Sequence, residues 1–206
     1  MCSSDLGIYK FNVKYSDRPV YLVFNTRNGE LNTDGKTISG FQKLGNNTQV
    51  YIYLETQENP IKIGTHQGDK IQIADRNTKG KNAYYIIEYP KGTKEINLRY
   101  GVSFISTDQA EKNLRREIKK YDLNAVAQQA KNIWNESLGK ISISGGTENQ
   151  KAIFYTSLYR TYERMICISE DGKYFSAYDG KIHDDNGTPF YVDDWIWDTY
   201  RATHPL

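Results

Sequence analysis

Hydrophobic and polar residues alternate along roughly the first hundred positions of the chain, and this period of two is typical of strands that bury one face. The alternation is clearest over residues 95–105, where Ile96, Leu98 and Tyr100 are separated by polar residues. Weaker patterns of the same kind predict strands over residues 9–15, 20–24, 36–41, 49–55, 61–64, 70–74 and 84–89.

Turn-forming pairs lie between these predicted strands, and Asn28-Gly29 and Lys79-Gly80 are two of them. Many short strands separated at such intervals predict an antiparallel β-sandwich or a similar antiparallel fold. We therefore expect a β-sandwich domain over residues 7–105.

The period changes to that of helices at Ser106. Ser106 and Thr147 are each followed three residues later by a glutamine, which is the spacing of a capping box at a helix N-terminus. Asp122 is placed to begin another helix and Gly139 to end it. The pattern thus predicts a helix over residues 107–120, a second one up to Gly139 and a third from Thr147 to about residue 162.

The last sixty or so residues mix short strands with one further helix. Turn residues and short apolar runs predict a strand at 141–143, a hairpin of 165–169 with 173–178 around Asp171-Gly172, a polar loop over 179–189, and a final helix capped by Asp193 or Asp194. Strands that precede helices favour separate domains over a βαβ fold. We expect linker helices over residues 106–140 and a helical domain that begins within 141–206.

Both ends of the sequence indicate an internal piece of a longer protein. Residues 1–6 resemble a translated sequencing adaptor and are interpreted as a non-native scar. The aromatic-rich stretch from Trp195 to Leu206 is unusual for an exposed tail and looks like a helix that stops within a domain.

The overall composition excludes several classes of protein. Hydrophobic residues make up 38% of the chain and charged residues 25%, as in ordinary globular proteins, so collagen, coiled coils and low-complexity disorder are excluded. The net charge of +2, with scattered Lys and Arg, gives no electrostatic footprint for nucleic acid. No apolar run is long enough to span a membrane. Two cysteines cannot build a disulfide framework.

Few segments offer a familiar catalytic or metal-binding pattern. Nucleophile-elbow, P-loop, zincin and C-x-x-C motifs are absent, and the three histidines are far apart in sequence. The segment 145–147 could bind an anion or could be a tight turn before a capped helix. The loop 184–187 resembles a calcium turn only loosely, because it lacks the regular series of ligands.

The densest group of chemically active side chains lies between residues 191 and 201. Three carboxylates and two indoles fall within residues 193–198. An indole can stack on the apolar face of a sugar ring while a carboxylate accepts hydrogen bonds from its hydroxyls. Alternatively, Asp194 caps the helix, Asp198 pairs with Arg201, and the indoles belong to the core.

Several motifs together resemble glycoside hydrolase family 92, a family of bacterial α-mannosidases, many of them specific for α-1,2 links. They are G-G-T-E-N-Q at 145–150, F-Y-T-S-L-Y-R at 154–160 and W-D-T-Y-R-A-T-H-P-L at 197–206. Residues 102–106 and 134–138 also fit the junction between the two domains of this family. The resemblance extends from about residue 36 to the end of the chain, with departures at 162–165 and 193–196 that affect the expected linkage specificity.

The resemblance implies a β-sandwich joined by helices to an (α/α)₆ barrel, so that residues 141–206 would be the start of the barrel. It also implies an inverting, calcium-dependent exo-mannosidase, periplasmic or secreted, that acts on mannose-capped glycans. Asp198 matches the aspartate expected to hydrogen-bond the terminal mannose, with Trp197 beside it. The family's general acid, general base and calcium ligands are expected beyond Leu206, so the chain alone is expected to be inactive.

Two other functions remain open on the sequence. The 17 tyrosines, many of them in the predicted sheet, could make it a non-catalytic carbohydrate-binding module. The sheet could also be purely structural and serve to present the barrel.

Overall fold

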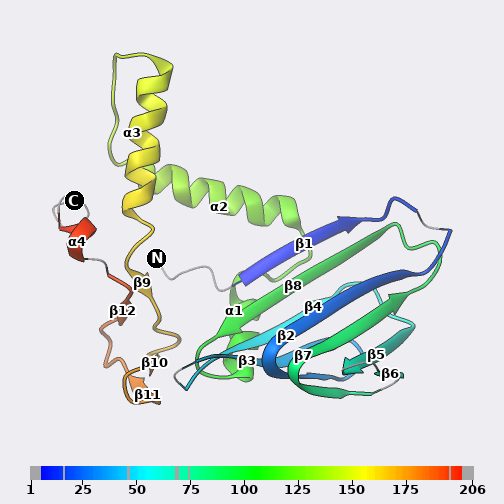
Figure 1. Ribbon diagram of the computed structural model, residues 1–206. Coiled ribbons are helices and arrows are strands. Elements are labelled where there is room, and N and C mark those ends of the chain that lie inside the picture. Colours follow the sequence, from blue (N-terminus) through cyan, green and yellow to red (C-terminus); the bar gives the residue numbers. More distant parts are fainter. Residues whose placement is uncertain are drawn as a thin grey trace.

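The computed structural model describes residues 6–15, 17–45, 47–67, 70–73, 75–194 and 196–200, with backbone only at 66–67, 70–73, 82–83 and 198–199. Strands occupy the first half of the chain and helices follow (Figure 1). The predicted order of elements is therefore confirmed. The expected scar covers residues 1–5, which lie outside the described part, and Leu6, which is the first residue of a strand.

Eight strands form one antiparallel sheet in the order β1-β8-β4-β3-β2-β7-β5-β6. All eight segments predicted as strands are present, with Ala74 outside the described residues. The strands are β1 (Leu6–Asn12), β2 (Val20–Thr33), β3 (Thr37–Gly45), β4 (Thr48–Thr56), β5 (Lys62–Gln67), β6 (Lys70–Ile73), β7 (Asn77–Tyr89) and β8 (Glu95–Ser103).

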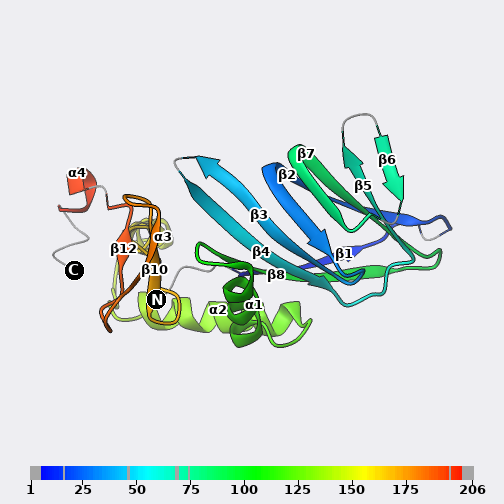
Figure 2. The same cartoon turned by 90° about the horizontal axis from the view of Figure 1, so that it is seen from below.

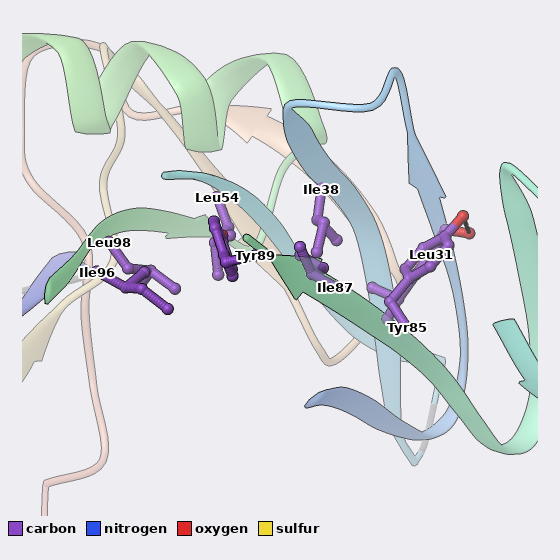
Figure 3. Packing of buried hydrophobic residues seen from close by; sticks show 8 residues of the cluster. All are labelled: Leu31, Ile38, Leu54, Tyr85, Ile87, Tyr89, Ile96 and Leu98. Atoms are coloured by element: carbon purple, nitrogen blue, oxygen red, sulfur yellow. Dashed lines mark hydrogen bonds between the residues drawn. The ribbon is translucent and has the colours of Figure 1, made fainter. Parts of the chain in front are cut away.

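The predicted antiparallel strand fold is present, and in the described residues it is one sheet that curves over itself rather than a sandwich of separate sheets (Figure 2). The Tyr89 hydroxyl on β7 donates to Thr56 Oγ1 at the end of β4 across 3.1 Å, although two strands separate β7 from β4 in the sheet. The inner face is filled by a buried apolar cluster (Figure 3). Its members are Leu31, Ile38, Leu54, Tyr85, Ile87, Tyr89, Ile96 and Leu98.

Two predicted turns are wrong, because β2 and β7 continue through them. Gly29 of β2 pairs with Gly80 of β7, and the register shifts on either side of Arg27. A side chain at Gly29 would come to 2.0 Å from the carbonyl oxygen of Phe41 on β3. The Asn28-Gly29 pair thus forms a bulge in long paired strands, where the residue without a side chain lets β3 approach.

The helix boundaries follow the predicted capping residues. Ser106 Oγ accepts from the Gln109 amide at 3.0 Å, and Asp122 Oδ1 accepts from the Ala125 amide at 2.9 Å. Thr147 forms the full capping box, in which side chain and backbone bond reciprocally. The helices are α1 (Thr107–Glu117), α2 (Leu123–Leu138), α3 (Glu148–Thr161) and α4 (Ile196–Thr199).

The predicted turn at Asp171-Gly172 is confirmed, but the strands pair differently from the prediction. Two short ladders form instead of one hairpin, and residues 141–143 are not a strand. The reason is that the segment after Gly172 finds a nearer partner within the loop expected over 179–189. The ladders join β9 (Ile166–Cys167) to β12 (Tyr191–Val192) and β10 (Lys173–Ser176) to β11 (Lys181–Asp184).

Helix α1 packs on the outer face of β8, opposite the apolar cluster (Figure 2). Gly101 makes this approach possible, because a side chain there would come to 2.3 Å from the carbonyl oxygen of Ala110 in α1. The strand is consequently buried on both faces over most of its length.

A buried carboxylate joins α1 to the sheet. Glu55 on β4 pairs with Arg99 on β8, and its Oε2 lies 2.8 Å from Arg115 Nη2 on α1. Its Oε1 also accepts from the Tyr121 hydroxyl at 3.1 Å, in the loop after α1. Arg99 donates in addition to the carbonyl oxygen of Ile118 and stacks on the Tyr121 ring, 4.6 Å from its centroid. We call Glu55, Arg99, Arg115 and Tyr121 the junction cluster.

Replacing Glu55 by alanine should reduce the free energy of unfolding by about 3–5 kcal/mol, because it leaves the nearly buried Arg99 without its carboxylate. The matched control is Glu111→Ala, which removes the other glutamate bound to Arg115, on an exposed surface, and should cost less than about 1 kcal/mol. Urea unfolding followed by circular dichroism measures both. Equal losses in the two variants would contradict this role of the junction cluster.

The junction cluster should also make the fold sensitive to acid. Burial raises the pKa of Glu55, but hydrogen bonds and charge from Arg115 and Arg99 outweigh it and hold the pKa below its ordinary value of 4.5. The stabilisation is therefore complete above pH 4.5 and is lost as the pH falls through the lower pKa of the folded state. Urea midpoints between pH 7 and pH 3 should fall more steeply for the wild type than for Glu55→Gln.

Candidate functional site

The predicted sugar-contacting residues lie at the end of the described chain. Trp197 belongs to α4, and its side chain is 78% exposed. The Trp197 indole is thus not buried among the described residues, and the alternative interpretation, in which both indoles belong to the core, stays a prediction. The side chains of Asp198 and Trp195 and the whole of Arg201 lie outside the described part, so the expected Asp198–Arg201 pair is not tested.

The segment that carries α4 is held by a strand ladder and an ion pair. Tyr191 and Val192 of β12 pair with Cys167 and Ile166 of β9. The next residue, Asp193, has a left-handed backbone with φ of 64° and forms an ion pair with Arg164. Asp193, one of the two residues expected to cap the last helix, thus binds the chain that follows α3.

A groove of about 990 Å³ separates α2 and α3 from the β9–β12 ladder. The sequence did not predict it, because its walls come from segments up to 185 positions apart, from Leu6 to Tyr191. Three aromatic residues, Trp134, Tyr162 and Tyr191, are among its lining residues, and the ring centroids of Trp134 and Tyr162 lie 5.9 Å apart. Trp197 is not among the lining residues.

The glycine pair before α3 leads into the capping box at the start of that helix. Gly145 and Gly146 have φ of 78° and 71°, which positions Thr147 at the helix start. The Thr147 amide donates to Gln150 Oε1 at 2.8 Å, and the Gln150 amide donates to Thr147 Oγ1 at 3.3 Å. These two donors are therefore occupied, which favours the capped turn over an anion site.

Two carboxylates in the β10–β11 region, those of Asp179 and Asp185, make local hydrogen bonds within turns. Asp179 Oδ2 lies 2.9 Å from His183 Nε2. Desolvation raises the pKa of Asp179, but hydrogen bonds from the Lys181 backbone and from His183 lower it below its ordinary value. Asp185 Oδ1 accepts from the Gly187 amide at 2.9 Å, as in a turn.

No group of three or more metal-ligating side chains occurs among the residues whose side chains the structure describes. His66 and His204, the other histidines considered, have no described side chain. Within the same part of the chain, none of the helices has the length and apolar character that a membrane crossing requires.

The C-terminal part of the chain matches a known enzyme family. The model of the glycosyl hydrolase family 92 catalytic domain matches residues 109–206, from α1 onward. A protein described as an uncharacterized secreted glycosidase of Arthroderma benhamiae is 38% identical over 74 residues, which cover 34% of this chain and 10% of that protein.

Solved structures of the same family share the fold of nearly the whole chain. A family GH92 inverting mannosidase of Bacteroides thetaiotaomicron VPI-5482 has a TM-score of 0.84 and 28% identity, covering 98% of this chain and 29% of that one. A family GH92 α-mannosidase from Bacteroides thetaiotaomicron has a TM-score of 0.86 and 23% identity, covering 98% of this chain and 30% of that one, and at this identity shows the fold alone.

The chain therefore spans less than a third of the length of these solved relatives. The expected resemblance is confirmed by two independent kinds of similarity: the sequence match that begins in α1, and a fold shared by the sheet, the helices and the short ladders. The chain is thus similar to glycoside hydrolase family 92 proteins in the sequence of residues 109–206 and in the fold of nearly its whole length.

Proposed function

We propose that the chain is the sheet-and-helix portion of an inverting exo-α-mannosidase that removes α-1,2-linked mannose from mannose-capped glycans. The observation that carries the proposal is the likeness to an inverting mannosidase over 98% of the chain at 28% identity. One of the solved structures that share this fold is a family GH92 α-mannosidase in complex with mannoimidazole. The match to a secreted glycosidase supports a secreted or periplasmic location.

The contribution of this chain is to hold the terminal mannose. Trp197 presents an indole with 78% of its surface exposed, which suits stacking on the apolar face of a pyranose. Asp198, the next residue, would accept hydrogen bonds from the sugar hydroxyls. Inversion needs a general acid and a general base on opposite sides of the scissile bond. We assign both to residues that follow this chain in the parent protein, as the start of an (α/α)₆ barrel at α3 implies.

Calcium is proposed as a cofactor of the parent protein and not of the described residues, which offer no suitable group of ligands. In such a site the ion would bind sugar hydroxyls and fix the position of the ring. The residues that hold it are proposed to lie in the same following segment as the catalytic acids.

The second candidate function is carbohydrate binding by the sheet itself. Tyr9 and Phe11 on β1 are 50% and 41% exposed, and Tyr21 on β2 is 54% exposed. However, the Tyr9 ring stacks against Phe11 and Tyr100, with centroids 5.9 and 6.1 Å away, so its faces are already occupied. Mannan binding that survives Trp197→Ala and is lost in Tyr21→Ala would favour this function over the first.

The 206-residue chain should not hydrolyse an aryl α-mannoside in the presence of calcium, because the general acid and general base that inversion needs are proposed to lie in another part of the parent protein. Release of the aryl alcohol measures hydrolysis. Turnover that disappears in Asp198→Ala would show that the chain carries its own catalytic machinery and would overturn the assignment.

Substitution of Asp198 by asparagine, made at the matching aspartate of the inverting mannosidase, should lower kcat/KM by roughly one to two decades. The reason is the loss of a charge-assisted hydrogen bond to the sugar, worth about 1.5–3 kcal/mol. Unchanged kinetics in this variant would return Asp198 to a purely structural role.

A further inference from the structure

We propose that Glu170 is a positioning residue for the sugar-contacting segment, which it fixes relative to α1 and the sheet. The inference rests on the proposed function for the role of Trp197 and Asp198. It names a residue that does not touch the sugar and that acts through the β9–β12 ladder.

Glu170 is buried, with 4% of its surface exposed, although it lies in a connection between short strands. Its Oε1 accepts from the Phe104 amide at 3.0 Å, at the junction between β8 and α1. Its Oε2 accepts from Asn113 Nδ2 of α1 at 2.7 Å. A buried carboxylate is costly unless its oxygens are bonded, so these two contacts fix the connection to one place on α1.

The neighbouring residue reinforces the same attachment. Asp171 Oδ2 accepts from Gln109 Nε2 at 2.7 Å, and its Oδ1 lies 2.5 Å from Arg116 Nη1. Asn113 Oδ1 accepts in turn from Gln109 and Arg116, both at 3.1 Å. One face of α1 thus binds Glu170 and Asp171.

A short run of bonds leads from Glu170 to α4. Ser169 Oγ accepts from the Phe190 amide at 2.8 Å, and the Ile168 amide donates to the Phe190 carbonyl oxygen at 2.9 Å. The β9–β12 pairs follow directly, and α4 begins four residues after β12 ends. A displacement of residue 170 therefore shifts the strand that leads into Trp197.

Helices α2 and α3 are not hydrogen-bonded to Glu170 among the described residues. They pack on each other, and Trp134 of α2 packs against Tyr159 of α3. Within the described part of the chain, the hydrogen bonds of Glu170 join it to Asn113 of α1, to Phe104 and to Lys173. Loss of its carboxylate should accordingly loosen the β9–β12 ladder and α4, and leave α2 and α3 in place.

The test is hydrogen–deuterium exchange with mass spectrometry on the full chain, for Glu170→Ala and Glu170→Gln. Glu170→Ala should exchange at least tenfold faster over residues 166–168 and 190–192, and less than twofold faster over 148–161. Glu170→Gln should give a smaller increase in the same peptides, because its oxygen can still accept from Phe104 while its amide nitrogen meets Asn113 Nδ2. It also carries the test if the alanine variant does not fold.

Glu148→Gln is the matched control, since Glu148 is exposed and pairs only with Lys151, and it should leave both sets of peptides unchanged. Uniformly faster exchange in the Glu170 variants, or none at all near residues 190–192, would overturn the positioning role. A parallel titration with methyl α-mannoside tests the proposed function separately. Absence of binding to the wild type would count against the sugar site, while the exchange pattern would still decide the role of Glu170.

Discussion

The arrangement of this chain depends on one buried carboxylate shared by two arginines. Glu55 lies on the outer face of the sheet, where Arg99 comes from the neighbouring strand and Arg115 from α1. Neither the strands nor the helix could bury these charges alone, because each would leave a group unpaired. The junction cluster therefore forms only when α1 is packed on the sheet, and it fixes the position of α1 relative to the strands.

Helix α1 carries two attachments, which makes it the centre of the fold. The junction cluster binds it to β4 and β8, and Asn113 and Arg116 bind it to residues 170 and 171. The sheet and the segment that leads to α4 do not need an extensive contact with each other, because both are bound to α1. The position of the proposed sugar-contacting residues relative to the sheet is thus set by the contacts that α1 makes with both.

Most of the fold could be predicted from sequence because its determinants are local. Alternating apolar residues located the strands, and Ser106, Asp122 and Thr147 located the helix starts. The bulge at Asn28-Gly29 was missed, since the same residue pair suits a tight turn and a bulge, and only the pairing with Gly80 decides between them. The curvature of the sheet depends on such pairings and was missed for the same reason.

The candidate site was predictable only in part. The motif at residues 197–201 predicted Trp197 and Asp198 as sugar contacts, and this stays a prediction, because the Asp198 side chain lies outside the described part. Glu170 gave no signal, because a glutamate beside an Asp-Gly turn looks like a solvated loop residue until Phe104 and Asn113 are brought to it. The groove beside α2 and α3 was equally hidden, as its walls meet only in the folded chain.

The absence of a side chain at Gly101 has a consequence for how such enzymes could be recombined. The backbone of α1 lies so close to β8 that even a methyl group at this position would collide with it. Fusing these helices to the sheet of another protein would succeed only if the strand facing α1 had a glycine at this position. It would also need an arginine two residues before that glycine. The sheet and the helices are therefore complementary in shape where they meet, and β8 and α1 would have to be exchanged together.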